Sequence, residues 1–145
     1  MRGIADANVL LLLLTEGHAH QAPAADWWDA CIDGDVGPSL PVRMAPWRQL
    51  TNSRVMGSSP LRPAQAGNVV QALIDDPRVV IMDQVPPSHG KHWYDCIARR
   101  EASLDLWTDA WHAALATPLD CDMITFDRVF RAFAKLKLRL LEPAT

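Results

Sequence analysis

The sequence predicts an α/β protein in which helices flank a central, mostly parallel sheet. Short apolar stretches of strand length alternate with longer segments whose apolar residues recur every three or four positions, and this alternation is typical of β-α-β units. No internal repeat or low-complexity linker divides the chain. With 145 residues, 49% of them hydrophobic, we expect a single domain over residues 1–145.

The strands are expected where a short apolar run stands between turn residues. The first run, Gly3 to Ala5, ends on Asp6, and the Leu-rich segment that follows is too long to continue as a strand. Gly37 and Pro38 interrupt the second run. The four later strands are expected at Val36–Pro41, Val79–Met82, Asp122–Thr125 and Leu138–Leu141.

The helices are expected where a capping residue or a proline precedes an apolar stripe. Pro63 fits the first turn of one helix, and Ala66, Val70 and Leu73 then form its buried stripe. A further helix begins directly after Asp6. Apart from this helix after Asp6, helices are expected over residues 23–34, 42–52, 63–75, 89–100, 107–116 and 128–135, with a loop over 53–60.

The composition indicates a cytoplasmic protein without a membrane partner. The longest apolar run, Val9–Leu14, is far shorter than the roughly 20 residues that a membrane span needs. Asp6 and Glu16 flank this run and argue against a signal peptide. The three cysteines form no C-x-x-C pair and are odd in number, so we expect neither a disulfide framework nor a structural zinc site.

The net charge of −3 does not by itself indicate nucleic-acid binding, but the basic residues are unevenly distributed. Such clustering is compatible with a basic face for a ligand and equally with an ordinary solvated surface. The cluster lies near the C-terminus and contains Arg128, Arg131, Lys135, Lys137 and Arg139.

Three aspartates are placed so that they can converge. Asp6 and Asp127 follow strands, and Asp109 lies in the first turn of a helix. Each has a local structural role open to it, as a helix cap, as a favourable charge at a helix start, or in an Asx turn. However, parallel strands end at one edge of a sheet, where ligands collect. Clustered carboxylates repel each other unless a cation is bound, and all-oxygen ligands suit Mg²⁺ or Mn²⁺. The pattern therefore predicts metal-dependent phosphodiester hydrolysis.

The order and spacing of four stretches resemble the PIN-domain ribonucleases, in particular the VapC toxins of bacterial VapBC toxin–antitoxin pairs. This resemblance covers nearly the whole chain. It implies a PIN-like three-layer fold and a metal-dependent endoribonuclease that cleaves RNA and is neutralised by a small cognate VapB-like antitoxin. The stretches are Ala5-Asp-Ala-Asn-Val-Leu10, Arg48-Gln-Leu-Thr-Asn-Ser-Arg-Val55, Trp107-Thr-Asp-Ala-Trp-His-Ala-Ala-Leu-Ala116 and Ile124-Thr-Phe-Asp-Arg-Val-Phe130.

The resemblance assigns roles to individual residues. Asp6, Asp109 and Asp127 match the catalytic, metal-binding acids of the family, with Mg²⁺ or Mn²⁺ as the cofactor. Asn8 and Thr125 match its supporting polar positions.

Two departures from the family pattern raise a second reading, a degenerate PIN domain that binds RNA or a partner without cutting. Relatives usually place a glutamate on the helix before the Arg-x-x-Thr-Asn stretch, where this chain has no acid between Arg43 and Ala45. Many also carry a second acid at the position of Val129. Asp83, at the end of the third expected strand, is a candidate for a replacement ligand.

A different enzyme class, the aspartyl-phosphate phosphatases of the haloacid dehalogenase type, also begins with an Asp after the first strand. Those enzymes need a second Asp two residues later, where this chain has Asn8, and a downstream lysine that has no suitable match here. The hypothesis of a nuclease is therefore favoured.

Contacts with RNA and with partners are expected at a few further positions. Arg48, Arg128 and Arg131 are candidates for RNA binding, since a guanidinium group holds phosphate well. The Leu10–Leu14 run and the stripe with Trp27 exceed the needs of one small sheet, although plain core packing also accounts for them. We expect part of this surface to serve a homodimer or an antitoxin helix.

Overall fold

The computed structural model describes residues 1–142 and confirms the predicted α/β class with a parallel sheet. Three strands pair in the order β1-β2-β3. Ile4 pairs with Met123, which in turn pairs with Leu138. The strands are β1 (Gly3–Ala5), β2 (Asp122–Thr125) and β3 (Leu138–Leu140).

The sheet continues on the other side of β1 through single bridges, all of them parallel. The two segments concerned were predicted to be full strands, Val36–Pro41 and Val79–Met82, and this prediction is wrong. Pro38 lacks the N–H that a ladder needs, and prolines also flank the second segment at Pro77 and Pro86. The bridges are Gly3 to Val36, Val36 to Val79, and Ser39 to Met82.

The helices match the predicted ones in place but often end earlier. The helix expected over 128–135 is a shorter 3-10 helix, η1. The loop expected over 53–60 begins with a helical turn, because the Asn52 side chain accepts a hydrogen bond from the Arg54 amide and caps it. The helices are α1 (Ala7–Leu13), α2 (Gln21–Asp29), α3 (Leu40–Leu50), α4 (Ser53–Met56), α5 (Pro63–Ile74), α6 (His89–Ile97), α7 (Leu106–Ala116) and η1 (Arg128–Ala132).

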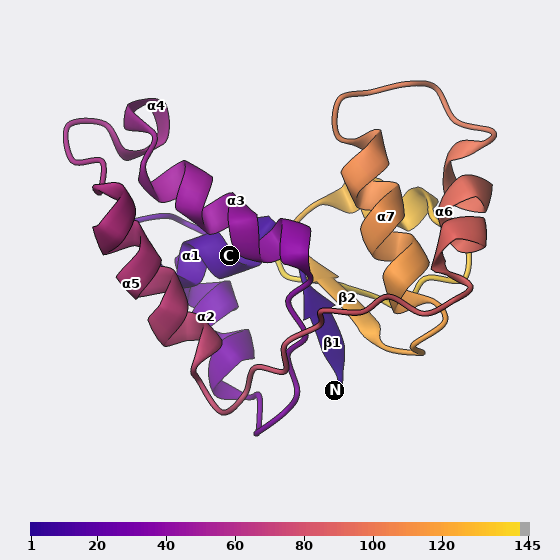
Figure 1. Ribbon diagram of the computed structural model, residues 1–145, viewed down its shortest axis with the longest axis horizontal. Coiled ribbons are helices and arrows are strands. Elements are labelled where there is room, and N and C mark those ends of the chain that lie inside the picture. Colours follow the sequence, from indigo (N-terminus) through magenta and orange to yellow (C-terminus); the bar gives the residue numbers. More distant parts are fainter. Residues whose placement is uncertain (143–145) are drawn as a thin grey trace.

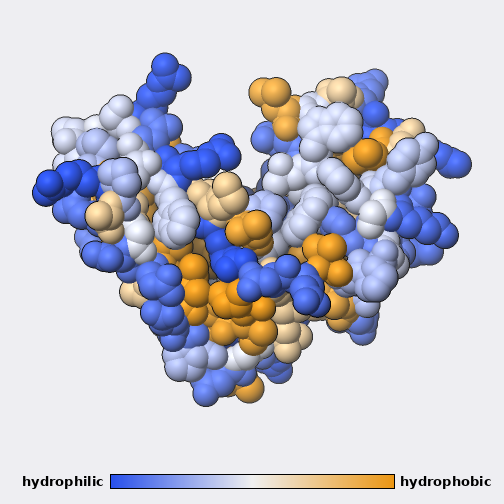
Figure 2. All heavy atoms as spheres, viewed as in Figure 1, coloured by the Kyte–Doolittle hydropathy of each residue, from blue (hydrophilic) through white to orange (hydrophobic). Residues whose placement is uncertain are grey.

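Alternating side chains of β1 and β2 enter two separate cores, which gives the three layers. Ile4 and Met123 pack in the cluster that contains α7, whereas Ala5 and Ile124 pack with α1, α2 and α3. Figure 1 accordingly shows α6 and α7 on one side of the strands and α1 to α5 on the other. Figure 2 shows a notch in the surface between these two groups of helices.

The order of the segments predicts one position in the sheet for a ligand site. From β1 the chain moves outward through Val36 and Val79, then returns to the opposite side of β1 to form β2 and β3. Ligands of open α/β sheets bind at the carboxyl ends of the strands where the order reverses in this way. That point lies between the ends of β1 and β2, where Asp6 and Asp127 follow the strands.

The helices are short. None within residues 1–142 has the length and apolar character that would allow it to cross a membrane.

Candidate functional site

Asp6 is fixed at the end of β1 by hydrogen bonds from both of its neighbouring elements. Its amide donates to the Ile124 carbonyl at 2.8 Å, which extends the pairing with β2 by one residue. Its Oδ1 accepts from the Ala7 amide at 2.7 Å and caps α1, while its Oδ2 accepts from Thr125 Oγ1 at 2.7 Å. The side chain therefore has little freedom to turn.

Thr125, at the end of β2, links the two acids that follow the strands. Besides donating to Asp6, its Oγ1 accepts from the Asp127 amide at 3.0 Å. Asp127 Oδ1 accepts from the Val129 amide at 2.8 Å, which caps η1. Because Thr125 is fully buried, this connection is shielded from water.

The third acid, Asp109, lies in the first turn of α7 and is half-buried. Burial, together with the negative charges of Asp6, Asp127 and Asp105, raises its pKa to about 7. The three predicted acids are thus brought close enough to repel each other.

The pKa of Asp6 is raised as well, chiefly by burial and to a lesser extent by the charge of Asp127. The hydrogen bonds from Thr125 and Ala7 oppose this rise because they stabilise the carboxylate. Within residues 1–142, no hydrogen bond of this kind opposes the rise of the pKa of Asp109.

The donors of this region fit a hard divalent cation. All are oxygen atoms, and Oδ1 of the neighbouring Asn8 is buried without a hydrogen-bond partner in the described chain. As they stand, no three His, Cys, Asp or Glu side chains of residues 1–142 come close enough together to form a complete metal site. The chemistry of the donors suits Mg²⁺ or Mn²⁺, and the role of the three aspartates as its ligands stays a prediction.

One buried histidine of α7 makes a polar contact with a distant segment. His112, one turn after Asp109, is buried, and its Nε2 lies 3.1 Å from Ser39 Oγ just before α3. Burial, helped by the nearby His89, lowers its pKa to about 4, so the ring is neutral near pH 7. The bond joins α7 to α3 across 73 residues, and no sequence pattern signals it.

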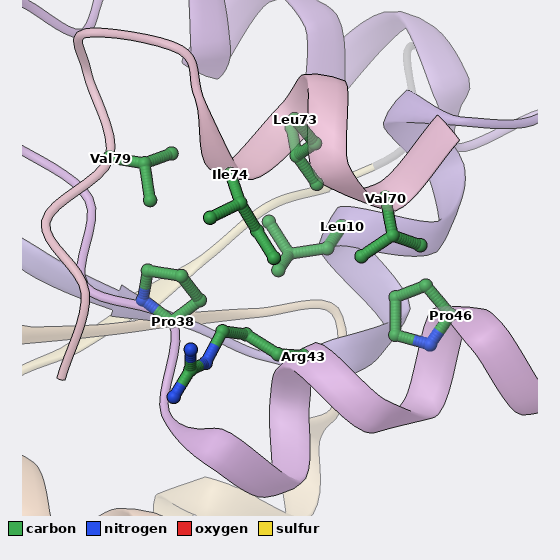
Figure 3. A pocket seen from close by; sticks show the side chains of 8 residues that line it. All are labelled: Leu10, Pro38, Arg43, Pro46, Val70, Leu73, Ile74 and Val79. Atoms are coloured by element: carbon green, nitrogen blue, oxygen red, sulfur yellow. The ribbon is translucent and has the colours of Figure 1, made fainter. Parts of the chain in front are cut away.

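The helix region where the family pattern led us to expect a glutamate contains an arginine that forms an ion pair. Figure 3 shows Arg43 among apolar side chains, which enclose a void of about 10 Å³. Its Nη2 contacts Asp83 Oδ1 at 2.6 Å. Long cationic side chains often pack their stems in this way and keep the charged group near solvent. The structure places Asp83 in this ion pair with Arg43, and Asp83 is not among the charges that shift the pKa of Asp6 or Asp109. It does not replace the missing glutamate.

The arginines predicted to bind RNA are all exposed. Arg48 lies in the last turn of α3, and Arg128 and Arg131 lie on η1, directly after Asp127. Within the described chain, none of the three is in an ion pair. Another member of the C-terminal basic cluster, Lys137, is paired with Asp120 at 2.7 Å.

An apolar groove of about 680 Å³ begins beside the acids, at Asn8. Leu10 is part of the core and does not line it, whereas other members of the Leu run do. The apolar side chains that line the groove are Leu11, Leu12 and Leu14 of the α1 region, Val55 and Met56 of α4, and Phe126.

Comparison with protein families gives a match to the PIN domain over residues 4–136. Among curated proteins, the chain is similar to ribonuclease VapC41 of Mycobacterium tuberculosis, with 29% identity over 142 residues, 95% of this chain and 97% of the relative.

Two solved structures show the same fold at low sequence identity. One is a chain from the Rickettsia felis VapBC2 complex bound to a fragment of its promoter DNA, with 11% identity, a TM-score of 0.69, and 98% and 100% of the two chains covered. The other is VapC20 of Mycobacterium tuberculosis, described as a Sarcin-Ricin loop cleaving toxin, with 20% identity, a TM-score of 0.66, and 93% and 98% covered.

Proposed function

Because this chain belongs to the PIN-domain family, we propose that it is a metal-dependent endoribonuclease, the toxin of a toxin–antitoxin pair, which hydrolyses RNA phosphodiester bonds. The observation that carries this proposal is the Thr125 hydroxyl, which connects Asp6 and Asp127 at the point where the strand order reverses. Asp109 lies near enough to the negative charges of Asp6 and Asp127 for them to contribute to the rise of its pKa. The curated relatives named as ribonucleases match over nearly the full length.

Asp6, Asp109 and Asp127 are the residues that would hold Mg²⁺ or Mn²⁺. A divalent cation bound there supplies Lewis-acid stabilisation of phosphate charge and a more acidic water. Its positive charge would also relieve the repulsion that raises the pKa of Asp6 and Asp109.

The other residues of the site act by holding and orienting. Thr125 and the Ala7 amide fix the Asp6 carboxylate, and the Val129 amide fixes Asp127. Arg128, exposed one residue after Asp127, is well placed to bind a phosphate of the RNA strand, with Arg131 and Arg48 as further contacts.

The apolar groove beside the site supports a protein partner of the antitoxin class. It is lined by Leu11, Leu14, Val55 and Met56, and it fits an amphipathic segment that lays its apolar side chains into a groove. A solved structure with the same fold is a VapBC complex. The expected homodimer is a separate proposal, and a monomeric mass by light scattering of the isolated protein would contradict it.

The direct test is cleavage of total cellular RNA by purified protein freed of any antitoxin. We expect discrete fragments with Mg²⁺ or Mn²⁺ that disappear with EDTA and in an Asp6→Asn variant. Asparagine keeps the shape and one acceptor oxygen of the side chain, so a folded but inactive variant assigns the loss to the charge. Absence of cleavage by the folded wild-type protein in either metal would contradict the proposal.

The competing function, RNA or partner binding without cleavage, is favoured by the missing fourth acid. Arg43, paired with Asp83, and Val129 occupy the regions where relatives carry acids. Binding of labelled RNA by a protein that cleaves none in any metal would identify this function.

A further inference from the structure

Two aromatic rings are stacked next to the acid cluster. His20, just before α2, lies almost parallel to Phe126, with ring centroids 4.7 Å apart and an angle of 16° between the planes. Both side chains are half-buried, and His18 meets His20 edge-on at 5.2 Å. Phe126 is covalently bonded to Thr125 and Asp127, so the stack is anchored directly to the candidate site.

The stacked pair borders two hollows at once. The larger one is the apolar groove that begins at Asn8. The smaller one, of about 200 Å³, is lined by His20, Phe126, Arg128 and Glu142, among others. Arg128 is not paired with Glu142 or with any other acid of the described residues, so its guanidinium is free to bind an anion.

These features match one nucleotide of a single-stranded RNA. A flat base can continue a stack of parallel rings, and its phosphate then lies within a few ångströms, where a guanidinium group can hold it. An apolar peptide would use the Leu and Met walls of the groove, but it has no need of a cation beside a parallel aromatic pair. The aromatic end of the groove therefore favours RNA.

We propose that the His20–Phe126 pair is the stacking platform for an unpaired base that flanks the cleaved bond, with Arg128 on the adjoining phosphate. This inference rests on the proposed ribonuclease function and names the form of its substrate. The enzyme selects strands whose bases are free to leave a helix, because a paired base cannot reach the platform.

The test uses a single-stranded RNA oligonucleotide that the wild-type protein cleaves, and a series in which one base at a time is removed to leave an abasic ribose. We expect His20→Ala and Phe126→Leu to lower kcat/KM on the full oligonucleotide by about 5- to 150-fold, mainly through KM. Removing the stacked base should cost the wild-type protein a similar factor at one position near the cut. At that position, removal of the base should cause no further loss of kcat/KM in the two variants.

The matched control is Tyr94→Ala, which removes an exposed aromatic ring from α6, outside both hollows. Thermal melting of each variant checks that it is folded. Phe126→Leu keeps most of the apolar volume of Phe126, which is partly buried in the core.

The possible outcomes are distinguishable. If the wild-type protein cleaves RNA and the two variants behave like Tyr94→Ala, the platform is refuted while the ribonuclease function stands. If the two variants lost the same factor in kcat/KM at every abasic position, the platform would also be refuted, since such losses indicate a structural role for the two rings. Unchanged kinetics with weaker binding of the cognate antitoxin would assign the stack to the protein partner. If the wild-type protein cleaves no RNA, both proposals fall.

Discussion

The acids that follow the strands and the acid on helix α7 are held in different ways. Asp6 and Asp127 accept hydrogen bonds from backbone amides, and Thr125 connects them. Asp109 is instead distinguished by its pKa, which burial and, to a lesser extent, the neighbouring negative charges raise to about 7. The strand ends thus build a preorganised part of the site, whereas the charge state of Asp109 depends on pH and on any cation.

Helix α7 carries a second titratable group whose pKa is shifted in the opposite direction. His112, one turn from Asp109, has its pKa lowered to about 4. In both cases burial is the main cause, because it disfavours the charged form of either side chain. The pH dependence of stability should therefore come from α7 to a larger extent than from the strand ends.

The largest effect is expected from removing a charge at a strand end. Asp127→Asn keeps an oxygen that can accept from the Val129 amide, so the fold should be retained. Substitution of partners that only orient a ligand costs about 10- to 100-fold, so loss of a direct ligand should lower the cleavage rate more than about 100-fold. Initial rates with Mn²⁺ measure this, and a loss below about tenfold would place Asp127 outside the metal site.

A second prediction concerns His112 and acid stability. Its folded-state pKa, about 4, lies below the ordinary 6.5, so its contribution to stability is present above 6.5 and is lost as the pH falls toward 4. The shift corresponds to about 3–4 kcal/mol. His112→Gln keeps an N–H donor toward Ser39 but cannot titrate. Chemical denaturation across this pH range should show that the free energy of unfolding falls less steeply for the variant than for the wild-type protein as the pH is lowered. Parallel dependences on pH for the two proteins would contradict the prediction.

A smaller effect is expected at Thr125, where the change alters orientation and leaves all three charges in place. Thr125→Val removes the hydroxyl that binds both strand-end acids and should lower kcat/KM or metal affinity by about 10- to 100-fold. Thr125→Ser should restore most of it. Equal activities of the Val and Ser variants would show that the hydroxyl does not orient the acids.

The smallest effect is expected in the stability of metal-free Asp109→Asn. The folded-state pKa of Asp109, about 7, exceeds its ordinary 3.8, so its stabilising contribution is present below 3.8 and is lost as the pH rises toward 7. Because the side chain is half-exposed, we expect a gain of only about 1 kcal/mol for the variant at about pH 8, or about 4 °C in Tm.

Two controls sharpen this last test. Near pH 4 the two proteins should melt together. Added Mn²⁺ should raise the Tm of the wild-type protein more than that of the variant, since a ligand stabilises the state that binds it. A variant that is less stable than wild type at about pH 8 without metal would contradict the shifted pKa.

The sequence predicted the parts of the molecule that are determined locally. Strand β1, the helix α7 and the placement of Asp6 and Asp127 follow from apolar runs, turns and caps, each contained within a few residues. The contacts that it missed join distant segments, such as Arg43 with Asp83 and His112 with Ser39. These pairs depend on how the helices pack, and opposite charges 40 residues apart give no periodic signal.

The errors in the outer strands have a related cause. The residues of Val36–Pro41 and Val79–Met82 are apolar enough for strands, but prolines limit the number of hydrogen bonds they can make. Whether such a segment forms a ladder or a single bridge is decided by its neighbours in space. The three proposed metal ligands follow the same logic, since pattern and topology bring the acids together without specifying the final distances between their oxygens.

The pairing of β1 with β2 also determines when in the life of the chain the acid cluster first exists. Asp6 is made before its partner Thr125, which lies 119 residues later. Chains are made from the N-terminus, and contacts of such long sequence separation form only after the intervening segment is present and ordered. A ribosome-bound chain that still lacks β2 therefore has no assembled acid cluster. A ribonuclease of this design can act only after β2 has been made and has paired with β1.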